Sequence, residues 1–202
     1  MVKLFAGKVR ISVFVPLLCV VAMFSSDAVF LYIILCCAAF HEFGHLLAMR
    51  LLGAEFRYIS IYPFGVDIRT DTSHLSYGQE AVVALAGPFA SVALALVSAG
   101  LYFFLPGIYS GAVTVTNLLF FAVNIFPVRG LDGGRILLSL LFMRFEFSKA
   151  YRIYLFVSTG AFAVLCMAAL IILFLTGYNL SLAFMCVYLF LSEYSRQKLL
   201  GE

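Results

Sequence analysis

The sequence predicts an all-α polytopic membrane protein with about six transmembrane helices, and three observations lead to this prediction. The 202 residues are 64% hydrophobic and only 11% charged, whereas a soluble domain is roughly half apolar and a quarter charged. The apolar residues are concentrated in several runs that can cross a bilayer at about 20 residues per crossing. The basic residues fall at the termini, in alternate connections between the runs, or at the run ends next to them. We therefore expect residues 1–202 to form a single membrane-embedded domain.

The apolar runs define the expected spans, of which the first and the last are short. They cover Ile11–Ser25, Ala28–Leu52, Gln79–Leu105, Gly111–Pro127, Tyr151–Thr176 and Leu180–Tyr194. Leu131–Phe147 is apolar but carries interspersed charges, so it is either an interfacial helix or a continuation of the fourth span. Glu55–Tyr62 and Val66–Thr70 alternate in polarity on either side of a turn, which predicts a short cytoplasmic-side β-hairpin or membrane-associated loop.

The positions of the 13 Lys and Arg residues set the expected orientation. With six spans, both termini and the connections 53–78 and 128–150 share one side of the membrane. Every lysine and arginine lies on that side or at its boundary, and the opposite connections contain none. Basic loops remain in the cytoplasm, so both termini are expected there. We expect a multi-pass protein of the cell membrane whose environment is the lipid bilayer, with no nucleic acid as a partner.

The motif His41-Glu42-Phe43-Gly44-His45, within the second apolar run, indicates metal-dependent hydrolysis. On a helix the two histidines are one turn apart, so both imidazoles can bind the same ion. Glu42 lies beside them, placed to take a proton from a metal-bound water. Ionisable side chains are costly to bury in hydrocarbon and by default mark a working site. The alternative is a buried polar network between helices without a metal.

A catalytic zinc ion usually has three protein ligands, and it accepts carboxylate oxygen as well as histidine nitrogen. Asp132 is the best candidate for the third ligand. It is expected to end the fourth span on the cytoplasmic side, where Pro127 and neighbouring glycines break the helix. The other carboxylates near span ends are Asp27, Glu80 and Glu193. The alternative interpretation of Asp132 is an interfacial helix cap or turn residue.

These motifs occur in the order found in the site-2 family of intramembrane metalloproteases, and the chain resembles the compact branch that includes the stage IV sporulation protease. The HExxH signature matches His41–His45, and the Asn…Pro…Leu-Asp-Gly signature matches Asn124–Gly133. Ala86–Pro88 and Tyr62–Gly65 resemble two further family motifs. Ser91 departs from the family pattern, since many members have Asn a few residues after Gly-Pro.

The resemblance implies one zinc ion (Zn²⁺) per chain, bound by His41, His45 and Asp132, with Glu42 as the catalytic general base. It implies that Asn124 binds the substrate backbone or the developing oxyanion, although an interhelical hydrogen bond is an alternative role for this residue. The implied function is a zinc endopeptidase that cuts a membrane-associated protein in or near a transmembrane segment. Regulated release of a transcription or sigma factor is the implied setting, and regulatory membrane proteins are further expected partners.

A membrane metal-ion transporter using the same ligands is the alternative function. It is disfavoured because the polar groups cluster at one depth on one side of the membrane, with no charged pathway to the other face. Glu42 distinguishes the two functions, since hydrolysis requires a base and transport does not.

Overall fold

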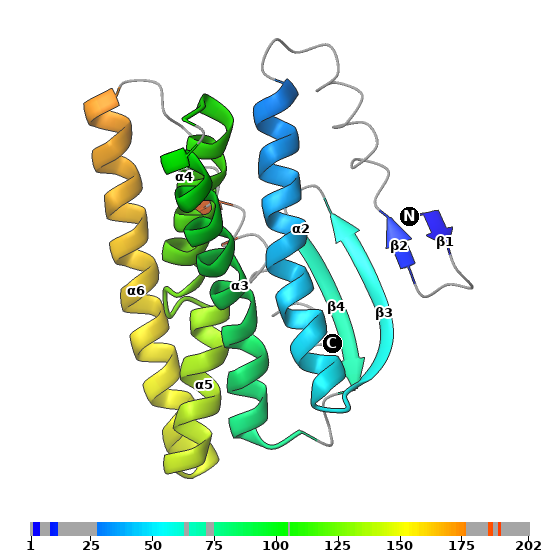
Figure 1. Ribbon diagram of the computed structural model, residues 1–202. Coiled ribbons are helices and arrows are strands. Elements are labelled where there is room, and N and C mark those ends of the chain that lie inside the picture. The colour runs from blue at the N-terminus through cyan, green and yellow to red at the C-terminus, as the bar shows by residue number, and fades with distance from the viewer. Residues whose placement is uncertain are drawn as a thin grey trace. The chain divides into compact units, whose positions relative to one another are not determined.

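The structure is a computed structural model that describes residues 2–4, 9–11, 28–62, 65–71, 75–104, 106–176, 186–187 and 190. The chain divides into two compact units, residues 1–122 and 123–202. Figure 1 labels the helices and strands of both units.

Three helices in the described residues are long and apolar enough to cross a membrane: α2 (Ala28–Leu51), α3 (Tyr77–Phe104) and α6 (Phe147–Thr176). They correspond to the second, third and fifth expected spans. α4 (Ile108–Asn124) corresponds to the fourth and is apolar but only 17 residues long. The expected spans Ile11–Ser25 and Leu180–Tyr194 lie almost wholly outside the described residues. The predicted helical membrane fold is thus confirmed for the described spans.

The C-terminal end of α2 is fixed by a glycine. Gly53 has a φ of 74°, and its amide donates to the carbonyl of Arg50 at 3.3 Å. The amide of Ala54 donates to the carbonyl of Met49 at 3.0 Å. This is the Schellman arrangement, in which glycine takes the left-handed conformation without steric cost and satisfies the last helix carbonyls. The helix therefore stops at the end of the apolar run.

The N-terminal end of α3 is fixed by a capping box between Ser76 and Gln79. The Ser76 hydroxyl accepts a hydrogen bond from the backbone amide of Gln79 at 3.3 Å. The side-chain oxygen of Gln79 accepts one from the backbone amide of Ser76 at 2.9 Å. This pair satisfies two amides that the first helical turn leaves open. The helix starts at Tyr77, two residues before the start expected from hydropathy alone.

The alternating segment after α2 contains strands β3 (Glu55–Tyr62) and β4 (Gly65–Asp71), which pair antiparallel. β2 (Val9–Ile11) pairs parallel with β3, and β1 (Val2–Leu4) pairs antiparallel with β2. The strand order is β1-β2-β3-β4. Both sides of β3 are therefore occupied, and β4 is an edge of the sheet among the described strands.

The first unit brings α2 and α3 close together at a glycine (Figure 1). A Cβ atom on Gly44 of α2 would lie 2.5 Å from the carbonyl oxygen of Ala86 and 2.7 Å from Cβ of Ala90, both on α3. Such contacts are shorter than side chains tolerate, so only glycine permits this approach. Small residues at helix interfaces are typical of membrane helices, where close packing drives association.

α4 is tied to its neighbours by buried polar contacts. The side-chain amide of Asn117 donates a hydrogen bond to Sγ of Cys37 on α2 at 3.1 Å. The hydroxyls of Ser98 on α3 and Thr114 on α4 lie 2.8 Å apart. In an apolar environment these contacts satisfy polar groups that water cannot reach.

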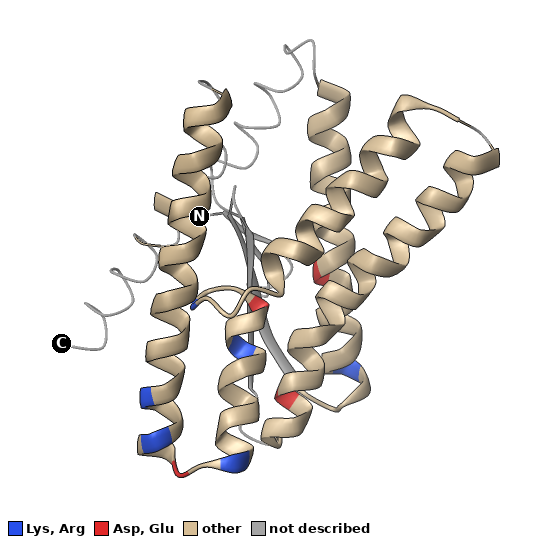
Figure 2. Ribbon diagram, turned by 90° about the vertical axis from the view of Figure 1, so that its left-hand side faces the viewer, with Lys and Arg blue, Asp and Glu red and all other residues tan. Residues whose placement is uncertain are grey.

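The second unit contains α5 (Asp132–Arg144) and α6, which lie side by side in Figure 1. Of the two alternatives for Leu131–Phe147, continuation of the fourth span is wrong, because α4 ends at Asn124 and α5 is a separate helix. Asp132 accordingly opens α5 instead of ending the fourth span, since Pro127 cannot continue α4. Arg144 at the end of α5 and Lys149 and Arg152 near the start of α6 lie close to the junction of the two helices, whereas Arg135 lies in the first turn of α5 (Figure 2).

The apolar core of this unit joins the segment before α5 to one face of α6. Its buried members are Val128, Leu131, Leu165, Ala169 and Cys186. The same face of α6 presents the buried hydroxyl of Ser158, which accepts a hydrogen bond from the backbone amide of Arg129 at 2.8 Å. α6 thus holds the polypeptide that leads into Asp132.

Candidate metal centre

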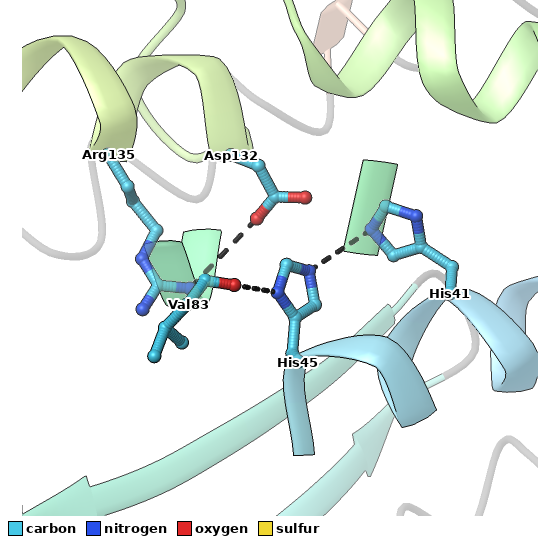
Figure 3. Close-up of polar contacts among 5 residues, drawn as sticks. All are labelled: His41, His45, Val83, Asp132 and Arg135. Atoms are coloured by element: carbon cyan, nitrogen blue, oxygen red, sulfur yellow. Dashed lines mark hydrogen bonds and ion pairs between the residues drawn. The ribbon is translucent and has the colours of Figure 1, made fainter. Parts of the chain in front are cut away.

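The two motif histidines lie on α2 and are almost completely buried, with exposed fractions of 5% for His41 and 3% for His45. Their ring centroids are 4.9 Å apart and their planes are inclined at 78°. The Nε2 atoms face each other at 3.2 Å (Figure 3). The i, i+4 spacing of a helix brings both imidazole edges to one point, as the sequence predicts.

The separation of the two Nε2 atoms fits a single tetrahedral ion. Zinc–nitrogen bonds of about 2.0–2.1 Å with tetrahedral angles place two nitrogen ligands about 3.3 Å apart. The observed 3.2 Å between Nε2 of His41 and Nε2 of His45 is close to this value. The pair could accept zinc without a change in the backbone of α2.

The second ring nitrogen of His45 is held by the main chain of α3. Nδ1 of His45 donates to the carbonyl oxygen of Val83 at 2.7 Å (Figure 3). A carbonyl oxygen can only accept, so the proton of the neutral ring is on Nδ1. Nε2 of His45 therefore carries a lone pair, which is the form that binds a metal.

The second ring nitrogen of His41 contacts a side chain of α3. Nδ1 of His41 lies 2.9 Å from Oγ of Ser91, and Ser91 has no exposed surface. Val83, Gly87 and Ser91 follow one another at intervals of four residues, so they share one face of α3. This face supplies a partner for each imidazole.

Gly87 provides the space in which the imidazoles lie. A Cβ atom at this position would overlap Nε2 of His45 and lie 2.7 Å from Nε2 of His41. The Gly-Pro motif identified in the sequence therefore has a direct steric role beside the histidines. The ring of Phe120 on α4, with its centroid 6.2 Å from that of His41, adds an apolar neighbour.

The other two site residues predicted in this part of the chain are less enclosed. Glu42 follows His41 on α2, and Asn124 is the last residue of α4. Both are partly exposed, in contrast to the two histidines. Their predicted roles as general base and substrate ligand remain predictions.

Asp132, in the second unit, follows a tight turn. The carbonyl of Val128 accepts from the amide of Leu131 at 3.1 Å, and Gly130 has a φ of 93°. A positive φ at the third residue is the feature of a type II turn, which favours glycine there. Arg129 and Gly130, which lengthen the motif between Pro127 and Leu131, thus form the centre of this turn.

Asp132 is the first residue of α5 and is only 8% exposed. Its carboxylate benefits from the partial positive charge at the N-terminus of the helix. Nη1 of Arg135 lies 3.9 Å from Oδ1 of Asp132 and is much more exposed (Figure 3). Both features favour a negative charge on Asp132, and metal binding requires the deprotonated carboxylate.

The two glycines after Asp132 allow α5 to start directly against the preceding turn. A Cβ atom on Gly133 would overlap the carbonyl oxygen of Ile125, and a Cβ atom on Gly134 would overlap that of Val128. Backbone contact therefore requires glycine at both positions after Asp132.

A buried HExxH pair on an apolar helix is the metal-binding arrangement that zinc-dependent proteases use. Residues 29–114, which include α2, α3 and the two histidines, match the model of peptidase family M50. The matched residues make up less than half of the chain and carry the HExxH motif. This match agrees with the family expected from the motifs, whereas the sporulation branch stays a prediction.

Among solved structures, the site-2 protease from Methanocaldococcus jannaschii is similar to this chain, with a TM-score of 0.65 and 21% sequence identity. The similarity covers 94% of this chain and 92% of that chain, and it shows a shared fold. No curated protein matches the chain significantly.

Sequence reasoning did not recognise the partners of the two imidazoles. Ser91 was noted only as a departure from the family pattern, although a serine in the middle of an apolar run, four residues after Gly87, was an available signal. The carbonyl of Val83 has no sequence signal, because any residue provides one.

Proposed function

We propose that this chain is an intramembrane zinc endopeptidase that hydrolyses a peptide bond in or near a transmembrane segment of a membrane-associated protein. The observation that carries the proposal is the 3.2 Å separation of Nε2 of His41 and Nε2 of His45. Nδ1 of each ring contacts a partner on α3, the hydroxyl of Ser91 for His41 and the carbonyl of Val83 for His45. Two buried imidazoles held in this way are expected of metal ligands.

Asp132 is the proposed third ligand of one zinc ion per chain. His41, His45 and Asp132 are a set of residues that could hold a metal ion. Two imidazoles and one carboxylate leave a fourth position for water or substrate, as in other catalytic zinc sites. The charges around Asp132 at the start of α5 support this role.

The proposed chemistry assigns one step to each remaining residue. Zinc, when bound, would polarise the scissile carbonyl and lower the pKa of a water to about 7. Glu42 takes the proton of the attacking water and passes it to the leaving amine. Asn124 donates a hydrogen bond to the substrate backbone or to the developing oxyanion. The partial exposure of Glu42 and Asn124 is compatible with contact to a substrate.

The proposed setting is the cell membrane, with several spans and with both termini and the active site toward the cytoplasm. The one-sided distribution of Lys and Arg supports this orientation. We further propose that both compact units belong to one protease domain, residues 1–202. Its substrate would be a membrane-bound precursor from which a transcription or sigma factor is released, and regulatory membrane proteins would control it.

The Glu42→Gln variant tests the function. Loss of the base should reduce cleavage of a reconstituted single-pass reporter protein by about 10²–10⁴-fold and leave the zinc content of the purified protein unchanged. Glu80→Gln, in the first turn of α3, is a matched control and should cleave normally. Normal cleavage by Glu42→Gln would reject the protease mechanism.

A further inference from the structure

We infer that Ser91 is a positioning residue that sets the orientation and the tautomer of His41, so that Nε2 of His41 is available to the metal. This inference rests on the proposed function, since it concerns the same ion. Its basis is the 2.9 Å contact between Oγ of Ser91 and Nδ1 of His41, together with the complete burial of Ser91.

The two imidazoles differ in how their protons are controlled. Nδ1 of His45 faces a carbonyl oxygen, that of Val83, which fixes the ring proton on Nδ1 in every state. The Ser91 hydroxyl facing His41 can either donate or accept a hydrogen bond. Residue 91 therefore permits both tautomers of His41, whereas His45 has only one.

Both tautomers of His41 have a use in this geometry. Without a metal and with both rings neutral, the 3.2 Å contact between the Nε2 atoms is favourable when His41 carries its proton on Nε2 and donates it to His45. Nδ1 of His41 then accepts from the Ser91 hydroxyl. With a metal on both Nε2 atoms, the ring proton of His41 is on Nδ1 and the Ser91 oxygen accepts it.

Removal of the Ser91 hydroxyl should therefore weaken metal binding by acting on His41. Without the hydroxyl, Nδ1 of His41 is left in an apolar environment without this partner, and the ring is free to turn away from the ion. Loss of such outer partners typically lowers metal affinity about 10–100-fold. Ser98 is a second buried serine of α3, bonded to Thr114, and its loss should not affect the ion.

Ser91→Val and Ser91→Thr form a matched pair, because they have nearly the same shape and differ in the hydroxyl. We expect Ser91→Val to bind zinc about 10–100-fold more weakly than wild type, measured by competition with a chelator in detergent. Ser91→Thr and the control Ser98→Ala should stay within a few-fold of wild type. Ser91→Ala, which adds no atoms, should follow Ser91→Val.

Cobalt provides a second readout that does not depend on cleavage. The visible absorption of the Co²⁺-loaded protein should change in Ser91→Val and Ser91→Ala but not in Ser98→Ala, because it reports on the ligand geometry. Equal zinc affinity of Ser91→Val, Ser91→Ala and Ser91→Thr would overturn the inference about Ser91. Failure of the wild type to bind near-stoichiometric zinc would instead overturn the proposed function.

Discussion

Gly87 on α3 lies directly against the imidazole of His45 on α2, and the space that a Cβ atom would need is filled by Nε2 of His45. The same position is close to Nε2 of His41, which a Cβ atom would approach to 2.7 Å. The absence of a side chain at residue 87 therefore leaves the space that the proposed metal site needs. Pro88, next to it, removes one main-chain hydrogen bond of α3.

We predict that Gly87→Ala loses most of its zinc and its cleavage activity, because the methyl group displaces the two imidazoles from their positions. Zinc content per chain after purification is the direct measurement. Gly100→Ala is the matched control on the same helix, since a Cβ atom there meets nothing within 4 Å. The control should keep its zinc and gain up to about 1 kcal/mol of helix stability. Full zinc occupancy in Gly87→Ala would contradict the steric role of Gly87.

Substitution of Asp132 by alanine should remove the third proposed ligand while the two imidazoles remain. We predict that Asp132→Ala loses near-stoichiometric zinc, and that both this variant and chelator-treated wild type lose cleavage. Re-addition of zinc should restore activity only to the wild type. The control is Glu146→Ala, which removes an exposed carboxylate at the junction of α5 and α6 and should bind zinc normally. An Asp132→Ala variant with full zinc occupancy would remove Asp132 from the ligand set.

The start of α5 should not tolerate a larger residue at Gly133. Gly133→Ala places a methyl group where the carbonyl oxygens of Ile125 and Phe126 lie. We expect it to destabilise the protein by about 1–3 kcal/mol, seen as a lower unfolding temperature in detergent. Gly160→Ala on α6 meets nothing within 4 Å and should unfold at or above the wild-type temperature. Equal stability of the two variants would show that the turn can shift to accommodate a side chain.

The edge strand β4 is the place where an extended substrate segment could add to the sheet. β3 already pairs with β2 and β4, so strand addition at β3 would have to displace a partner. We predict that proline substitutions along β4 reduce cleavage and spare zinc content, because proline removes a backbone donor at a sheet edge. A proline scan of residues 66–70 with parallel zinc and cleavage assays tests this. Undiminished cleavage throughout the scan would exclude capture at β4.

The histidine pair could be predicted because its chemistry depends on local spacing. Two residues four positions apart on a helix must point the same way, and the structure places the imidazoles of His41 and His45 accordingly. The long apolar runs likewise predicted α2, α3 and α6. Their ends were less accurate, because the capping box at Ser76 and the separate helix opened by Asp132 depend on individual hydrogen bonds and contacts.

The contacts across helices could not be predicted in the same way. Ser91 is separated from His41 by 50 positions in the chain, and their contact depends on how α3 is rotated and shifted along α2. That packing is set in part by the close approach of Gly44 to Ala86. Hydropathy gives the buried face of a helix but not its register against a neighbour. The turn at Arg129 and Gly130 was visible only as extra length in a motif.

The partner of His45 is a backbone carbonyl, so mutation of Val83 to any other residue would leave that acceptor in place. Of the contacts that Ser91 and Val83 of α3 make with the imidazoles at hydrogen-bonding distance, only the one from Ser91 comes from a side chain and can be changed by mutation. A small library at position 91 would vary the electron donation of one imidazole while the other stays constant. Such a series offers a route to retune which divalent ion the protein prefers without touching the ligands themselves.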